Sequence, residues 1–286
     1  MKAIYFKENN TNPMMKMSHL TTSTVATLFP FISNYIGLKV LCNPFSKRTY
    51  SFDTKLAPET FNIDSQYGPI KLYNFKGTGE TVLLTHGWSD NSSSFSELIN
   101  ELIEQGLNVW TFDHIGHGQS QGSTAHLFAF INGLKKVRDF IQNTQQQRID
   151  HLIGHSMGSV AIMNLEKDFL NERKTIFIST PVKFFEIMFA KIASAGFSHI
   201  FLKTLLENVS KKNNGDWQRL RPYHQFPKLN ANSLFIHDVK DKYAPFYDIQ
   251  VAQESSKFNL ISTSGLGHVR ILKSDELKKI IMEHLS

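Results

Sequence analysis

The stretch Gly154-His155-Ser156-Met157-Gly158 follows an apolar run at residues 149–153 and opens a run of small and apolar residues at 157–163. This order predicts a buried strand, a sharp turn and a helix, with the Ser156 hydroxyl projecting from the turn. Glycines stand two residues to either side of Ser156 because such a turn brings the backbone too close to its neighbours for a Cβ. The pattern is typical of a nucleophile elbow, so Ser156 is the candidate nucleophile.

Around this elbow, short apolar runs alternate with segments of helical period. We expect strands at residues 59–64, 70–75, 81–85, 107–112, 150–153, 175–178, 233–236 and 258–261. The first two strands are joined around Gly68-Pro69, which indicates a hairpin. Strands separated by helices of this length favour a mostly parallel sheet covered on both faces. The predicted fold class is therefore α/β, a doubly wound sheet with an antiparallel N-terminal hairpin.

The clearest predicted helix follows the third strand. Ser94 and Glu97 have capping-box spacing, apolar residues recur at helical intervals, and Gly106 stands where the helix should end. Between residues 180 and 227 the alternation breaks and gives an aromatic-rich helical stretch. We therefore expect a helical cap at residues 181–227, inserted into a core formed by residues 59–180 and 228–286. Residues 1–58 are expected to form an N-terminal helical extension packed on that core.

Composition limits the classes of partner. The 286 residues are 41% hydrophobic, which fits one globular unit, and the net charge of +6 comes from scattered residues, so no nucleic-acid partner is expected. The single cysteine, Cys42, cannot form an internal disulfide, which favours a cytoplasmic location. Residues 20–42 are apolar but interrupted by Pro30, Gly37 and Lys39, so a stable membrane span is not predicted. Export and peripheral membrane association stay open, and the oligomeric state is not indicated.

A serine hydroxyl needs a base within hydrogen-bond reach, and the base needs a group that orients it. In this sheet architecture the partners follow in the order serine, acid, histidine. His268 lies in a glycine-rich loop after the last strand, whereas His284 falls in the pattern of the terminal helix. Asp238 and Asp241 both follow the strand at 233–236, and Asp241 is far enough past its end to bend toward His268. We therefore select Asp241 and His268, and expect Asp238 to cap or turn the loop.

Taken together, these motifs resemble those of the α/β-hydrolase family. The matching segments are Thr85-His86-Gly87-Trp88, residues 113–120, the elbow at Ser156, and the acid and histidine loops. The resemblance implies an oxyanion hole formed by the backbone N–H groups of Trp88 and Met157. It also implies that Asp113, with the glycines that follow it, forms a structural turn.

The function expected from this resemblance is that of a serine hydrolase. A carboxylesterase acting on small or medium acyl substrates is favoured, with a small-molecule ester as substrate and no cofactor or metal. A thioesterase, a lysophospholipase or a C–C hydrolase of the same fold remains an alternative, as does a non-catalytic binding protein. A metal-dependent hydrolase using Asp113, His114 and His117 is disfavoured, since their spacing fits no metal-site pattern.

Overall fold

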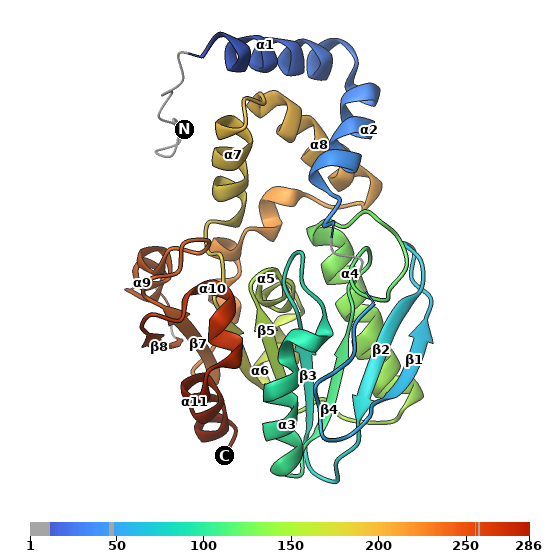
Figure 1. Ribbon diagram of the computed structural model, residues 1–286, viewed down its shortest axis with the longest axis vertical. Helices are drawn as coiled ribbons and strands as arrows, with labels where there is room; N and C mark the ends of the chain where they lie inside the picture. The colour runs from blue at the N-terminus through green and yellow to red at the C-terminus, as the bar shows by residue number, and fades with distance from the viewer. Residues whose placement is uncertain (1–11, 46–48, 255, 257) are drawn as a thin grey trace. The chain divides into compact units, whose positions relative to one another are not determined.

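The computed structural model describes residues 12–45, 49–254, 256 and 258–286 of the chain. These residues fall into two compact units. Unit 1 takes its residues from Met1–Asn43 and Lys183–Arg221, and unit 2 from Pro44–Val182 and Pro222–Ser286. Figure 1 labels the elements of both units.

Within the described residues, unit 2 is built on an eight-stranded sheet of order β1-β2-β4-β3-β5-β6-β7-β8. The β1–β2 and β2–β4 pairs are antiparallel, and every later neighbouring pair is parallel. The predicted α/β class with its N-terminal hairpin is therefore confirmed. The strands are β1 (Glu59–Ile63), β2 (Ile70–Phe75), β3 (Thr81–Thr85), β4 (Asn108–Phe112), β5 (His151–His155), β6 (Lys174–Ile178), β7 (Ser233–Asp238) and β8 (Asn259–Thr263).

Helices cover both faces of this sheet (Figure 1). On one face, alternate strand residues such as Val82, Ile153 and Ile236 pack with Leu98 and Ile281 in a buried cluster. These last two residues belong to α3 (Ser96–Glu104) and α11 (Asp275–Leu285). The intervening strand residues point to the other face. The remaining helices of unit 2 are α4 (Leu127–Asp139), α5 (Met157–Met163), α6 (Lys167–Asn171), α9 (Phe246–Glu254) and α10 (Gly267–Arg270).

The predicted start of α3 is wrong. The helix begins at Ser96, and a 3-10 turn, η1 (Ser92–Phe95), precedes it. Ser94 therefore lies inside the turn, where its hydroxyl donates to the carbonyl of Asn91 (2.9 Å) instead of capping α3. The side chain of Asn91 caps the turn by accepting from Ser93 N (3.0 Å). The predicted end is confirmed, because Gly106 takes a φ of 80° directly after the helix.

Unit 1 contains four longer helices: α1 (Pro13–Leu28), α2 (Pro30–Leu41), α7 (Phe184–Ser194) and α8 (His199–Lys212). Pro30 occupies the first turn of α2, where its missing N–H costs nothing. Ser198 joins two helices, because its hydroxyl caps α8 at Phe201 N (3.2 Å) and its own N–H donates to Thr22 Oγ1 of α1 (3.0 Å). No helix in the described part of the chain is long and apolar enough to cross a membrane.

Short helical turns fill the remaining connections. The buried rings of Phe185 and Trp217 lie 5.0 Å apart, so the turn that holds Trp217 packs on α7. These turns are η2 (Phe140–Thr144), η3 (Trp217–Leu220), η4 (Pro222–His224), η5 (Phe226–Lys228) and η6 (Ile271–Lys273), with η2 a π-helical turn and the others 3-10.

Candidate active site

The elbow has the local structure that the glycine spacing predicted. Ser156 stands between β5 and α5 with φ 51° and ψ −117°, a strained backbone for a residue with a side chain. A Cβ on Gly154 would lie 2.7 Å from Ser159 N, and one on Gly158 would lie 2.6 Å from the carbonyl oxygen of His86. Neither position can accept a larger residue without movement of the backbone. The prediction of a strand, a tight turn and a helix is confirmed.

The structure brings together the three side chains selected from the sequence. His268 Nε2 lies 2.9 Å from Ser156 Oγ, and His268 Nδ1 lies 2.7 Å from Asp241 Oδ2. One tautomer satisfies both contacts: Nδ1–H donates to the carboxylate, and the lone pair of Nε2 accepts the serine hydroxyl. The imidazole is thereby aligned to take a proton from Ser156. His268 is held on the short helix α10, which the sequence analysis described as a loop.

The Asp241 side chain is fully buried, and its second oxygen is also engaged. Oδ1 accepts hydrogen bonds from the backbone N–H groups of Tyr243 (2.8 Å) and Ala244 (2.9 Å). Burial raises the pKa of this carboxyl, but hydrogen bonds from His268 and from these amides outweigh it and hold the pKa below its usual 3.8. Asp241 is therefore an anion fixed in orientation toward His268 at neutral pH.

Asp238, the last residue of β7, has a different role from Asp241. Its buried carboxylate accepts from Lys240 N (2.9 Å), Leu266 N (2.9 Å) and Thr263 Oγ1 (3.1 Å). The first bond turns the loop after β7, as the sequence predicted. The other two bonds tie that loop to the segment that leads to His268, so Asp238 fixes the separation of the acid and histidine loops.

The predicted oxyanion donors lie beside the elbow. Met157 is the first residue of α5, so its N–H has no acceptor inside the helix. Gly87 passes so close to the elbow that a Cβ there would lie 2.9 Å from Ser156 Cβ. The carbonyl of Gly87 accepts from Nδ1 of His86 (2.8 Å). Because C=O and N–H point in opposite directions across a trans peptide, the N–H of Trp88 points away from the His86 ring.

A sequence profile of the serine aminopeptidase (S33) family matches residues 78–237, more than half of the chain. The protein belongs to this α/β-hydrolase family. The matched segment contains Trp88 and Ser156 and ends before Asp241 and His268. The positions of the acid and the histidine therefore rest on the geometry described above.

Other known proteins share parts of this hydrolase. Human monoglyceride lipase is 33% identical over 119 residues, which are 37% of this chain and 37% of that protein. An esterase of Pyrococcus furiosus has a similar structure, with a TM-score of 0.65 and 16% identity over 84% of this chain and 97% of its own. A thioesterase domain from the curacin biosynthetic pathway gives a TM-score of 0.55 and 16% identity over 81% and 100%. The structural matches show the fold alone, and the match to the lipase spans little more than a third of that protein.

Two buried histidines, His86 and His117, support the oxyanion segment, and neither role is predictable from the sequence motifs. His86 uses Nδ1–H to hold the Gly87 carbonyl, and its Nε2 accepts from the backbone N–H of His114 (3.0 Å). His117 Nε2 accepts from Ser89 N (3.2 Å), while its Nδ1–H donates to the Ile115 carbonyl (2.9 Å). Only a neutral ring can accept at Nε2, and burial together with the nearby His86 lowers the pKa of His117 to about 3.

His155, the residue before the nucleophile, links the elbow to the histidine loop. Its Nε2–H donates to the backbone carbonyl of His268 (2.8 Å), and its Nδ1 lies 3.9 Å from Asp90 Oδ2. Burial, followed by the nearby charge of His268, lowers the pKa of His155 to about 4. A neutral His155 therefore positions the main chain of His268. His155 is part of the elbow motif, so the sequence indicates a place for it beside the nucleophile. The sequence does not indicate that its partner is the His268 carbonyl.

Asp113 and His114, two of the three residues considered for a metal site, make other contacts. The Asp113 carboxylate accepts from the N–H groups of Ser92 (2.9 Å) and Gln119 (2.7 Å) and from two tyrosine hydroxyls. The His114 ring stacks on Phe130 at 3.7 Å between centroids. These contacts fix the turn after β4, which is the structural role expected for Asp113.

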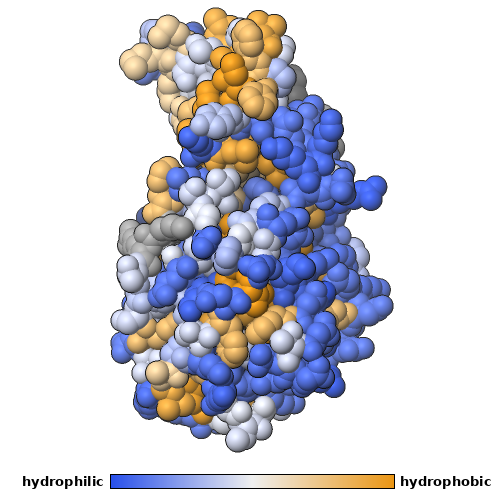
Figure 2. Space-filling view, turned by 90° about the vertical axis from the view of Figure 1, so that its right-hand side faces the viewer, coloured by the Kyte–Doolittle hydropathy of each residue, from blue (hydrophilic) through white to orange (hydrophobic). Residues whose placement is uncertain are grey.

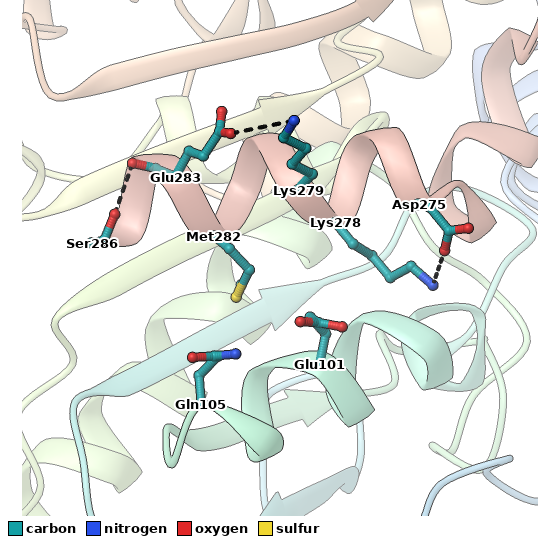
Figure 3. Close-up of a pocket in the computed structure, with 8 residues that line it drawn as sticks. All are labelled: Glu101, Gln105, Asp275, Lys278, Lys279, Met282, Glu283 and Ser286. Atoms are coloured by element: carbon teal, nitrogen blue, oxygen red, sulfur yellow. Dashed lines mark hydrogen bonds and ion pairs between the residues drawn. The ribbon is translucent and has the colours of Figure 1, made fainter.

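A separate hollow of about 510 Å³ opens between α3 and α11 (Figure 3). Charged side chains line most of it, and several are paired, with Lys278 2.8 Å from Asp275 and Lys279 3.9 Å from Glu283. Figure 3 shows these pairs along α11, with Glu101 of α3 and Gln105, the residue after that helix, opposite. None of the residues around Ser156 lines this hollow, so it is not the reaction site.

Proposed function

We propose that this hydrolase is a serine carboxylesterase that cleaves an ester-like acyl bond through Ser156, His268 and Asp241. The observation that carries the proposal is the pair of short contacts at His268, 2.9 Å to the Ser156 hydroxyl and 2.7 Å to the Asp241 carboxylate. An activated serine requires a base in contact and a group that orients the base. Membership of a hydrolase family is the second support.

Acylation begins when Ser156 Oγ attacks the ester carbonyl and His268 Nε2 takes the hydroxyl proton. The carbonyl oxygen becomes an oxyanion, which the N–H groups of Trp88 and Met157 stabilise. Asp241 stays ionised and stabilises the imidazolium. His268 then returns the proton to the leaving alkoxide, the alcohol departs, and the acyl group remains on Ser156.

Deacylation uses the same groups with water as the nucleophile. A water molecule attacks the acyl carbonyl, His268 takes one of its protons, and a second oxyanion forms between the same two N–H groups. When this intermediate breaks down, the proton passes from His268 to Ser156 Oγ. The carboxylic acid leaves, and the serine is restored.

The substrate is proposed to be a small molecule with a small or medium acyl chain. The likeness to monoglyceride lipase makes monoglycerides the first natural esters to test. The thioesterase domain among the similar folds keeps a thioester substrate as the alternative, along with a lysophospholipid or a C–C bond. Residues 181–227 are proposed as the cap that selects among them, since this helical stretch enters the chain between β6 and β7.

The test compares Ser156→Ala with wild type on p-nitrophenyl esters of increasing chain length, on monoglycerides and on an acyl thioester. Turnover by Ser156→Ala should fall by a factor of about 10³ or more, because the nucleophile is gone. Ser51→Ala, at an exposed serine outside the proposed cap, is the matched control and should keep full activity. Equal activity of Ser156→Ala and wild type would refute the proposal.

A further inference from the structure

Helix α2 is apolar overall, yet it buries its small and polar residues and exposes its apolar ones. The residues it buries are Ser33, Asn34 and Gly37, which are small or polar. A helix on the surface of a protein in water normally buries its apolar stripe and exposes polar residues. Apart from Lys39, the large side chains exposed on α2 are instead apolar or aromatic: Phe31, Ile32, Tyr35, Ile36 and Val40.

The small residues of α2 face α8 and allow close packing. A Cβ on Gly37 would lie 3.2 Å from Leu205 Cδ2, so a larger side chain would push the helices apart. Ser33 stands four residues before Gly37 and is fully buried. Small residues at this spacing are typical of helix pairs inside membranes, where the outward faces are left apolar for lipid. The arrangement leaves the aromatic and aliphatic face of α2 without a partner among the described residues of unit 1.

The exposed apolar surface continues onto α1. We define the α1–α2 surface as the ten large apolar side chains exposed on these helices and between them. Phe31 is the most prominent, with 84% of its surface exposed. In Figure 2, hydrophobic residues gather over the unit that holds α1 and α2. The other members are Met14, Met17, Leu20, Leu28, Phe29, Ile32, Tyr35, Ile36 and Val40.

The exposed threonine hydroxyls of α1 already have hydrogen-bond acceptors within the helix. The exposed hydroxyls of Thr21, Thr24 and Thr27 on α1 donate to the carbonyls four residues earlier, at 2.8, 2.9 and 2.9 Å. Such back-bonding lets a hydroxyl leave water without losing its hydrogen bond.

The charge of the α1–α2 segment is positive, and so is the net charge of unit 1. Residues 12–45 contain Lys16 and Lys39 and no Asp or Glu. The described residues of unit 1, 12–43 and 183–221, carry nine Lys or Arg against three Asp or Glu, a net charge of +6, equal to that of the whole chain. Lys39 Nζ lies 4.6 Å from the centre of the Tyr35 ring, so a cation and an aromatic ring stand together at the edge of the surface. Aromatic rings and lysines of this kind anchor helices at the interface of a bilayer with anionic lipids.

We propose that the α1–α2 surface docks on an anionic lipid bilayer, with the exposed face of α2 inserted among the headgroups and upper acyl chains. The helix then lies in the plane of the interface, with its exposed apolar side chains toward the acyl chains. The cytoplasmic leaflet is the anionic one, which fits the location expected from the sequence. This surface consists of side chains from unit 1 and includes none of the residues placed around Ser156.

The test measures co-sedimentation of the full chain with vesicles of phosphatidylcholine alone and with added phosphatidylserine. Phe31→Gln with Ile36→Gln removes the apolar face of α2 at exposed positions. Tyr247→Gln, at a side chain 68% exposed on α9 of unit 2, is the matched control. Wild type and control should bind the anionic vesicles. The affinity of the double variant should fall by about a hundredfold, because each of the two apolar side chains buried in lipid contributes about tenfold. Circular dichroism and melting temperature verify that each variant is folded.

The readout is binding, so a failed esterase assay and a failed vesicle assay are separate results. Absence of wild-type binding, or unchanged binding by the double variant, overturns the proposal. If wild type binds vesicles of pure phosphatidylcholine as tightly as vesicles that contain phosphatidylserine, the proposed role of charge is wrong. A third outcome is a wild type that is dimeric by light scattering and does not bind vesicles, together with a monomeric double variant. In that case a second copy of the chain is the partner, and the lipid proposal is wrong.

Discussion

Replacing Asp238 by asparagine should destabilise the hydrolase, whereas the same change at Asp241 should abolish turnover. The Asp238 carboxylate is fully buried and accepts three hydrogen bonds, with N–H donors at both oxygens. An asparagine must turn its NH₂ group toward Lys240 N or Leu266 N, so a donor faces a donor. Loss of one charged hydrogen bond with a buried N–H left unpaired costs about 2–4 kcal/mol. The melting temperature should fall by roughly 5–10 °C.

Asparagine at position 241 leaves fewer hydrogen-bond donors unpaired than asparagine at position 238. Its side-chain oxygen can still accept from Tyr243 N and Ala244 N, while its NH₂ group faces His268 Nδ1 in place of Oδ2. The imidazole is then held in the wrong tautomer, which lowers kcat by about 10⁴ in triads of this kind. The stability loss should be about 1 kcal/mol, because the amide bonds remain. The assay pairs thermal unfolding with turnover of a p-nitrophenyl ester for both variants.

The pH dependence of stability gives a further check on Asp238. Burial raises its pKa, but the hydrogen bonds from Leu266 and Lys240 outweigh burial and hold it below the usual 3.8. A carboxyl whose pKa is lowered by folding stabilises the protein above its unfolded pKa, and this contribution is lost as pH falls through the folded pKa. The difference between wild type and Asp238→Asn should therefore be full at neutral pH and shrink below about pH 4. An unchanged melting temperature for Asp238→Asn, or esterase activity retained by Asp241→Asn, would refute the assignment of the two carboxylates.

Three further changes test the support of the site. Gly158→Ala should destabilise the protein by about 1–3 kcal/mol in urea unfolding, because the new Cβ would lie 2.6 Å from the His86 carbonyl; wild-type stability would contradict the close approach. His155→Phe should lower kcat about tenfold through loss of one hydrogen bond to the His268 carbonyl. His155→Gln keeps a donor and should recover part of this loss in steady-state kinetics. Equal kcat for wild type and both variants would contradict the positioning role of His155. Exhaustive dialysis against a chelator should leave ester turnover unchanged, since the proposed chemistry uses side chains alone, and activity restored only by added metal would contradict this.

Much of the fold could be predicted because its signals are local. Each buried parallel strand is a short apolar run, and the strands β2 and β3 have the predicted bounds. The start of α3 could not be predicted as well, since Ser94 and Glu97 have the spacing of a capping box while Asn91 forms a competing cap one turn earlier. Local patterns do not reveal which of two adjacent caps a helix uses.

The residues of the site also divide into those that local motifs predict and those that depend on distant contacts. Ser156 was identified by its glycines, and the order of the acid and histidine loops limited the choice of partners. The support given by His86 and His117 was not predictable, because it depends on contacts between two loops some thirty residues apart. The exposure of the apolar residues of α2 is also invisible in the sequence, where an apolar helix face is interpreted as buried whichever way it points.

Labelling with a fluorophosphonate probe, followed by mapping of the adduct by mass spectrometry, tests the central claim most directly. Wild-type protein should carry the phosphonyl group on Ser156, and His268→Ala should label far more slowly, because its serine has no base in contact. An unlabelled wild type, an adduct at another residue, or equal labelling rates for wild type and His268→Ala would contradict the claim that Ser156 is an activated nucleophile.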